Sequence, residues 1–134
     1  MKKPTDTYKL YNGVEIPCIG FGTWQTPDGE DAVVDCSREH NMLLEAYSPL
    51  GVGRVFEVPE VQAMAEKYGR SIAQVCIRWS LQRGYLPLPK SVTPSRIVDN
   101  LNVFDFELDD EDVSLLAGLT GCAGLESDPD KTGF

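Results

Sequence analysis

The order of apolar and polar positions divides this chain into short extended segments and longer amphipathic ones. Near the N-terminus, apolar residues at 8–10 and 14–16 flank the dipeptide Asn12-Gly13. Both residues of this dipeptide accept the positive φ angles of a type I′ turn, so the pattern predicts an antiparallel hairpin. The apolar run at 18–22 follows, and its length and its glycines favour a buried strand.

Segments with a helical period follow, and several carry signals for where a helix begins or ends. Pro59 suits the first position of a helix, Gly69 suits the residue after its end, and Ser71 can cap the next helix. Acidic residues near the start of the first helix complement its dipole. We expect helices at 28–40, 59–68, 71–83, 94–101 and from 109 onward, and strands at 42–47 and 85–89.

The strand expected at 85–89 contains Pro87 and Pro89. Proline has no backbone N–H, so this strand lacks two hydrogen-bond donors and one of its sides should be poorly paired. The whole succession of a hairpin, strands and intervening helices is typical of the α/β class with a parallel sheet. The segment 120–134 is rich in Gly, Asp and Pro, and we expect it to form a loose tail.

Composition limits the class of protein. The 134 residues suit one domain, with 42% hydrophobic and 25% charged residues, which are ordinary globular proportions. The formal net charge of −9 argues against a general nucleic-acid binder, because contacts to phosphates need a basic face. No apolar run is long enough for a bilayer, and the first residues lead into no signal-peptide core. We expect a cytoplasmic protein that binds neither nucleic acid nor membrane.

Cysteine and histidine are too scattered to indicate a metal site. Cys18, Cys36, Cys76 and Cys122 form no C-x-x-C pair, and His40 is the only histidine in the sequence. This pattern favours free thiols over a zinc site. His40 follows polar residues at the end of an expected helix and is interpreted as solvated or helix-terminal. No G-x-S-x-G elbow or P-loop is present.

The segment 89–100 is the most informative for chemistry. It places Lys90 and Arg96 around the start of a helix, whereas cations are favoured near helix C-termini. Free N–H groups at the helix start, nearby hydroxyls and these two cations would together bind a phosphate. The alternative is that Lys90 and Arg96 form ion pairs with neighbouring acids such as Asp99.

Three other positions each have a functional and a structural interpretation. The segment 50–53 contains only G-x-G, so a plain loop explains it better than a backbone contact to a ligand. Tyr47 either presents its ring for stacking or packs in the core. Trp24 follows a strand, where barrel enzymes place functional residues, or else it packs against the hairpin.

Five segments together resemble one family. The segments 13–17 (GVEIP) and 20–24 (GFGTW) are similar to the opening hairpin and first barrel strand of aldo-keto reductases. Residues 45–51 (EAYSPLG) resemble the seventh strand of that family and its loop. Residues 88–100 resemble the eighth strand and the helix that binds the adenosine phosphate of the cofactor, and 127–130 (SDPD) is similar to the tail.

The resemblance also implies that a large internal part of the family fold is missing. That fold is a (β/α)8 barrel, which needs on the order of 250 residues. Here the first helix, near 28–34, passes directly into a segment that resembles the end of the sixth helix, 36–41. Strands two to six are absent, and with them the positions of the catalytic Asp, Tyr, Lys and His of the family. His40 has no match to that histidine.

We therefore expect one truncated barrel domain over 1–134. Its parts are the hairpin, first strand and helix at 1–34, the seventh and eighth βα units at 36–119, and the tail at 120–134. Strands seven, eight and one are neighbours in a barrel, so the resemblance implies a sheet in the order 7-8-1.

A connection from strand one back to strand seven is left-handed in that order if its helix stays outside, and such crossovers are rare. We therefore expect the helix at 29–40 to lie on the former barrel interior, giving a three-layer α/β/α unit. The alternative, which we favour, is a homo-oligomer, because three strands leave two edges and an apolar face.

The resemblance implies NADP(H) as the cofactor and assigns residues to it. Trp24 would line the substrate pocket. Tyr47 would stack on the nicotinamide, and Lys90 and Arg96 would lie beside the 2′-phosphate. The implied cofactor-binding residues are Thr23, Tyr47, Ser48, Leu50, Lys90, Ser91, Val92, Thr93, Arg96, Asp99 and Asn100.

Three functions follow as hypotheses. The first is a reductase remnant that keeps part of the NADP(H) site and has lost hydride-transfer catalysis. The second is an oligomeric structural or interaction protein whose phosphate-binding residues are vestigial. The third is a reductase that another chain completes. Proton donation to a carbonyl needs a positioned acid, and the resemblance leaves none here, which favours the first hypothesis.

Overall fold

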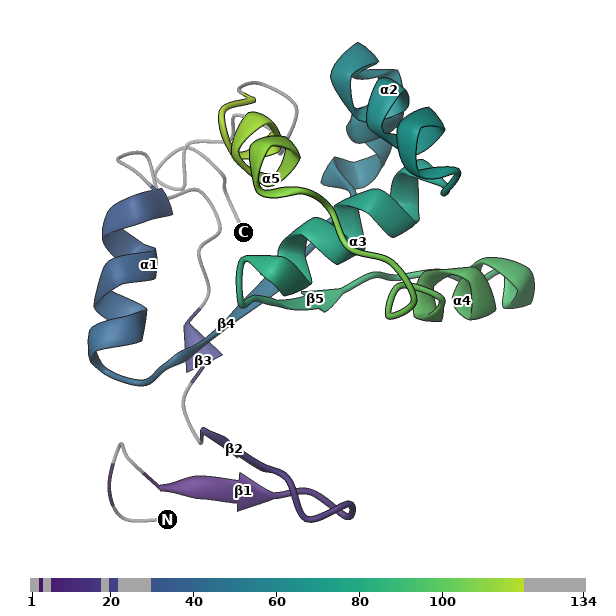
Figure 1. Ribbon diagram of the computed structural model, residues 1–134. Helices are drawn as coiled ribbons and strands as arrows, with labels where there is room; N and C mark the ends of the chain where they lie inside the picture. The colour runs from purple at the N-terminus through teal and green to yellow at the C-terminus, as the bar shows by residue number, and fades with distance from the viewer. Residues whose placement is uncertain (1–2, 4–5, 18–19, 22–29, 120–134) are drawn as a thin grey trace, which may run out of the picture.

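The computed structural model describes residues 3, 6–17, 20–21 and 30–119 (Figure 1). Strands and helices alternate along these residues, which confirms the α/β class. No helix among the described residues is long and apolar enough to cross a membrane. The elements are β1 Thr7–Lys9, β2 Glu15–Pro17, β3 Gly20–Phe21, α1 Glu30–Glu39, β4 Leu43–Tyr47, the 3-10 segment η1 Gly51–Glu57, α2 Pro59–Tyr68, α3 Ile72–Gln82, β5 Leu86–Leu88, α4 Pro94–Leu101 and α5 Asp110–Ala117.

The expected hairpin is present, but its turn is not of type I′. The Gly13 N–H donates to the Leu10 carbonyl over 2.9 Å, so the turn lies one residue earlier than expected. Gly13 has φ +86°, whereas Asn12 is not among the residues with positive φ. The type I′ prediction is wrong, because that turn needs positive φ at both residues. The Asn12 side chain instead accepts a hydrogen bond from the Val14 N–H.

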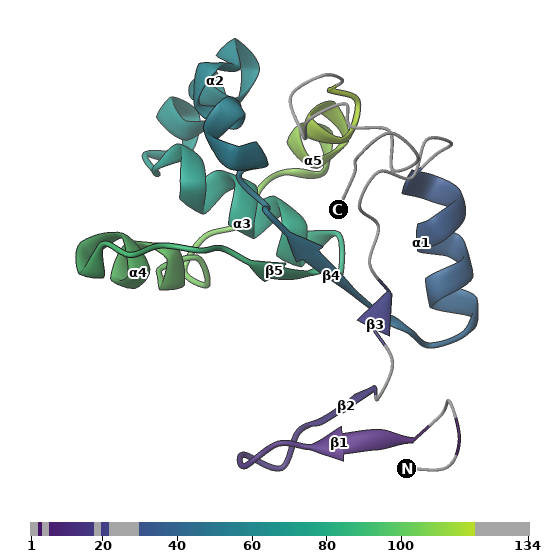
Figure 2. The same ribbon diagram turned by 180° about the vertical axis from the view of Figure 1, so that it is seen from behind.

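The sheet has three parallel strands in the order β3-β4-β5, with β4 in the centre (Figure 2). The predicted order 7-8-1, which puts β5 in the centre, is wrong. Within the described residues β5 pairs only with β4, so it is an edge strand. This agrees with the poor pairing expected from Pro87 and Pro89. The described strands form no closed barrel.

Helices α1 and α3 pack on the same face of this sheet. Val34 of α1 is buried against Leu44 of β4 and Tyr85, and Ala46 and Trp79 pack against the same cluster. The connection from β3 to β4 passes through α1, and the connection from β4 to β5 passes through α3. Both step in the same direction across the sheet with these helices on the same face, so the two connections have the same hand. In the order β3-β4-β5 each connection joins neighbouring strands, whereas the order 7-8-1 required the first connection to pass β5. The three-layer prediction is also wrong, since α1 does not cover the opposite face.

A second core lies between α2, α3 and α5. Its buried members are Met64, Ala65, Val75 and Leu108, and Trp79 packs against this cluster as well as against the first. The signals read from the sequence give the observed ends of the two helices. Pro59 begins α2, Gly69 follows its end with φ +60°, and Ser71 caps α3. The Ser71 and Gln74 side chains form a reciprocal capping box.

Candidate functional site

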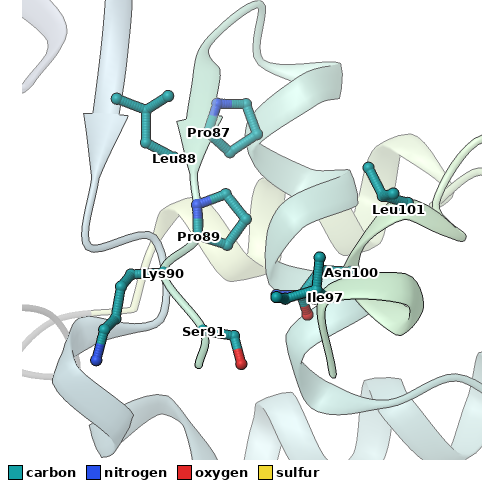
Figure 3. A pocket seen from close by; sticks show the side chains of 8 residues that line it. All are labelled: Pro87, Leu88, Pro89, Lys90, Ser91, Ile97, Asn100 and Leu101. Atoms are coloured by element: carbon teal, nitrogen blue, oxygen red, sulfur yellow. The ribbon is translucent and has the colours of Figure 1, made fainter. Parts of the chain in front are cut away.

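An open groove of about 530 Å³ lies where β5 ends and α4 begins (Figure 3). Most of its lining is apolar, and its polar members come from the segment singled out in the sequence. Figure 3 shows Leu88 and Lys90 on one side of the chain, and Pro87, Pro89 and Ser91 on the other. The lining residues are Pro87, Leu88, Pro89, Lys90, Ser91, Ile97, Asn100 and Leu101.

The start of α4 carries no side-chain cap. Thr93 occupies the N-cap position and Pro94 the first turn, as predicted, but the Thr93 side chain forms no capping hydrogen bond. The Ser91 hydroxyl accepts a hydrogen bond from the Thr93 N–H over 3.1 Å, which orders the turn before the helix. The N–H groups of the first helical turn are therefore left for solvent or an anion.

The two cations of this segment are exposed. Neither Lys90 nor Arg96 forms an ion pair within the described residues. The Asp99 carboxylate accepts a hydrogen bond from the Ser71 hydroxyl over 3.0 Å, and its main-chain carbonyl accepts one from the Gln74 side chain. The ion-pair alternative with Asp99 is therefore contradicted, because Asp99 faces α3.

Tyr47 is adjacent to the groove, since it pairs in register with Leu88 of β5. Its side chain is 45% exposed, and partial burial raises the pKa of its hydroxyl. Ser48 has φ +50° and begins the turn into η1, and Leu50 lies at the N-cap of η1. Val52 and Gly53 have φ +54° and +94°, so the segment 50–53 is an irregular turn at the start of η1, in agreement with the expected loop.

The remaining predicted site residues fall into two groups. Val92 is 80% exposed and Thr93 is exposed beside the groove, and neither belongs to its lining. Thr23 and Trp24 lie outside the described residues. Of the predicted set, the groove brings together Lys90, Ser91 and Asn100.

The apolar part of the groove was not predicted from the sequence. Ile97 and Leu101 are four residues apart on α4 and both line it, at 47% and 65% exposure. This helix has no buried residue at all. An i, i+4 apolar pair on a helix beside a proposed phosphate site is a signal for a lined groove, but in the sequence it is indistinguishable from an ordinary core face.

A second cluster has the residue types of a catalytic group but the geometry of a structural one. The Asp112 carboxylate accepts hydrogen bonds from Lys67, over 2.6 Å, and from the Tyr68 hydroxyl. These bonds raise the pKa of Lys67 and lower that of Asp112. The pKa of Tyr68 is raised as well, and burial is the largest cause. A raised tyrosine pKa makes a poorer proton donor. The cluster therefore joins α2 to α5.

His40, the only histidine of the sequence, is held by its own helix end. Its Nδ1 lies 2.9 Å from the Cys36 carbonyl and 3.8 Å from the Cys36 Sγ. Because a carbonyl only accepts, Nδ1 carries the proton in this contact. Among the described residues no group of three or more His, Cys, Asp or Glu side chains could hold a metal ion.

Fold and site together define a class. The chain is an α/β protein whose candidate ligand site lies at the carboxyl ends of parallel strands, beside an uncapped helix start. More narrowly, the chain belongs to the aldo/keto reductase family, because the model of that family matches residues 26–120, well over half of its length.

Curated relatives are similar over most of this chain. An aldo-keto reductase of Mycolicibacterium smegmatis is 43% identical over 98 residues, which are 73% of this chain and 35% of the relative. Methylglyoxal reductase DkgA of Escherichia coli is 43% identical over 96 residues, which are 70% of this chain and 35% of the relative. The chain therefore spans about a third of the length of the curated relatives it matches.

Solved structures give the same assignment. A crystal structure of a Gox0644 mutant in complex with NADPH matches with TM-score 0.71 and 36% identity, over 87% of this chain and 42% of that chain. The silkworm aldo-keto reductase AKR2E5 with NADPH matches with TM-score 0.60 and 34% identity, over 66% of this chain and 31% of that chain. The matched part of this chain thus has the local structure of the family.

Proposed function

We propose that this chain binds the adenosine phosphate part of NADP(H) in the groove beside α4, and that the chain alone does not reduce carbonyl compounds. The observation that carries the proposal is the pair Lys90 and Arg96, exposed and without ion pairs among the described residues, at a helix start with no side-chain cap. Cations without ion pairs at that end of a helix have an anion as their natural partner.

The residues present fit the cofactor that the two similar crystal structures contain, which is NADPH in both. Lys90, Ser91 and Arg96 offer charge and hydrogen bonds to a 2′-phosphate. Ile97 and Leu101 offer an apolar wall of the kind on which a base can lie. When bound to a complete reductase, the nicotinamide supplies a hydride.

We expect the chain alone not to reduce carbonyl compounds because the reaction needs a proton donor. A carbonyl oxygen that receives a hydride at its carbon needs an acid within hydrogen-bond reach. The resemblance assigns that acid and its helpers to the missing strands, and Tyr68 and His40 are held by contacts within the helical part. We accordingly include loss of the family's four catalytic residues in the proposal. The cytoplasmic location expected from the sequence is also part of it.

A fluorescence titration with NADPH tests the first half. We expect saturable binding, weaker binding of NADH, and at least about tenfold weaker NADPH binding in the double variant Lys90→Ala with Arg96→Ala, since each removes a charge-assisted contact. The matched control is Lys9→Ala, which removes one cation from the distant hairpin. No binding at millimolar NADPH would refute the nucleotide site.

An activity assay tests the second half separately. Purified chain, NADPH and an aromatic aldehyde should give no more NADPH oxidation than buffer. Turnover by the pure chain that disappears in the Lys90→Ala, Arg96→Ala double variant would show that a working proton donor is present. That result would overturn the claim of inactivity while supporting the site.

A further inference from the structure

The face of the sheet opposite α1 and α3 is apolar and exposed. Tyr47 is 45% exposed, Leu86 is 37% exposed and Leu88 is 46% exposed. The register sets Glu45 beside Leu86 and Tyr47 beside Leu88, so these four side chains share one face. These residues, with Lys90, are called the open stripe.

The open stripe carries one charge of each sign, placed symmetrically about its middle. Glu45 lies two residues before the level of Tyr47 and Leu88, and Lys90 lies two residues after it, on the same side of the chain as Leu88 in Figure 3. At about 3.3 Å per residue of extended backbone, each of these two residues is some 6.6 Å from the middle level, and they are about 13 Å apart along the strand direction. Among the described residues, Glu45 and Lys90 form no ion pair with each other.

We infer that the open stripe binds a second copy of this chain, with the strands of the two copies antiparallel across a two-fold axis at the level of Tyr47 and Leu88. This arrangement places Glu45 of each chain opposite Lys90 of the other and brings the two apolar centres together. A two-fold interface must be complementary to itself, and the stripe meets this requirement by having opposite charges at equal distances from its centre.

The exposed area is large enough for such an interface. The chain exposes 9439 Å² in total at a mass of 14.8 kDa. A compact monomer of that mass exposes about 7,000 Å². A standard interface takes only about 800 Å² from each partner. The exposed surface of the chain therefore provides the area that one dimer contact of standard size takes.

The net charge opposes self-association at long range, whereas the charges of the open stripe favour it locally. The net charge of −9 makes two copies repel each other at long range. The two Glu45–Lys90 contacts would offset this locally, while the apolar centre supplies attraction that does not depend on charge. Dimerisation should therefore strengthen with added salt, which screens the repulsion, until the ion pairs are screened as well.

Sedimentation velocity across a range of protein concentrations tests the inference, without nucleotide so that the result does not depend on cofactor binding. We expect a species of about twice 14.8 kDa at high concentration. Glu45→Lys and Lys90→Glu should each weaken the dimer about tenfold or more, because like charges then meet at both symmetry-related contacts. The double reversal should restore it to within about threefold of the original.

Glu60→Lys on α2 is the matched control, since it makes the same change in net charge as Glu45→Lys at an exposed site away from the stripe. It should leave the dimer unchanged. Far-ultraviolet circular dichroism of every variant shows whether it is folded. For any variant that fails to fold, Leu88→Asp supplies an independent disruption at the centre of the stripe.

Crosslinking gives a readout that folding alone does not move. A water-soluble carbodiimide joins a carboxylate to an amine that touches it, with loss of water to the reagent. In a mixture of normal and nitrogen-15-labelled chains, a Glu45–Lys90 peptide pair carrying one label of each kind proves contact between chains. A monomer at all concentrations, a dimer indifferent to single charge reversal, or a double reversal that fails to restore it would each overturn the inference.

Discussion

The Asp112 carboxylate joins α5 to α2 through several hydrogen bonds. It accepts hydrogen bonds from Lys67 and Tyr68 of α2 while its own main chain lies in the first turn of α5. The Tyr68 hydroxyl in turn accepts the N–H of Asp109 over 2.8 Å. The Asp112 side chain is only 11% exposed, so water cannot easily replace these partners. Its removal leaves the partly buried Tyr68 hydroxyl without this acceptor.

We expect Asp112→Ala to lower the free energy of unfolding by about 2 kcal/mol, the usual range for hydrogen bonds to a charged group. Urea unfolding at neutral pH measures this change. Asp110→Ala is the control, because Asp110 lies in the same helical turn with an exposed side chain. If both substitutions lowered the free energy of unfolding equally, the interaction of the carboxylates with the helix dipole would explain the loss, and not the contacts of Asp112 with Lys67 and Tyr68.

The same residue predicts how stability depends on pH. The pKa of Asp112 is lowered in the folded chain, chiefly by the hydrogen bond from Lys67. Its contribution is therefore complete above its unfolded pKa and is lost as the pH falls through the lower, folded pKa. The difference in stability between the wild type and Asp112→Ala should shrink between about pH 5 and about pH 2. A constant difference over that range would contradict this assignment.

Single residues also show where sequence reasoning succeeds and fails. Lys90 and Ser91 could be placed beside the groove because their helix start is encoded locally by Thr93 and Pro94. Asp99 could not be placed, because its partner Ser71 is 28 residues away in the sequence and meets it only through packing of α3 against α4. A local acid near two cations looks like their partner until the tertiary contact is known.

At the scale of elements, α3 and α4 form a natural pair for comparison. Ser71 caps α3 with its side chain, whereas Thr93 occupies the same position on α4 and makes no such bond. We expect Ser71→Ala to destabilise the protein by about 1 kcal/mol and Thr93→Ala to change stability by only a few tenths. Thermal unfolding of the two variants under identical conditions measures both. A larger loss for Thr93→Ala would show a cap that the structure does not contain.

The ends of elements were predictable and the order of strands was not. Pro59, Gly69 and Ser71 each act through the backbone beside them, so their signals survive any change in the rest of the fold. The position of β3 depends on which edge of β4 is available after the crossover, and no residue of β3 encodes that choice. The handedness rule made the order 7-8-1 unfavourable. In the structure, β3 instead pairs with the edge of β4 that faces away from β5.

At the scale of the whole molecule, two cores meet at one side chain. Trp79 packs against the helical cluster and against the sheet cluster, and its ring lies 6.1 Å from that of Tyr85. Its indole N–H donates to the Val113 carbonyl over 3.0 Å. Among the residues whose burial the structure describes, the sheet cluster has three buried members, so it depends on this bridge more than the helical cluster does.

Trp79→Leu should therefore loosen the sheet more than the helices. We expect backbone amides of β4 and α1 to exchange with solvent at least about tenfold faster, with a smaller change in α2, since local openings are set by local packing. Native-state hydrogen exchange measures this residue by residue. Phe104→Leu, at a 74% exposed aromatic, is the control. A uniform increase across all elements would mean that both cores open as one unit.

Lys90 takes part in both the proposed nucleotide site and the proposed dimer contact, so nucleotide binding and dimerisation are linked. If Lys90 binds a 2′-phosphate, it cannot at the same time pair with Glu45 of another chain. We expect NADPH, or 2′,5′-ADP alone, to raise the dissociation constant of the dimer, and NADH to do so much less. Sedimentation with and without each nucleotide measures the shift. A dimer that becomes tighter with NADPH would contradict the shared use of this lysine.

The prolines of β5 have a further consequence for how these molecules can polymerise. A sheet grows into a filament only when each added strand presents a competent edge to the next one. Pro87 and Pro89 have no amide hydrogen to offer an incoming backbone, so propagation fails at that boundary. Backbone pairing of the three-stranded sheet through its β3 edge would therefore stop once two molecules had met, so this sheet forms a terminated pair and not a fibre.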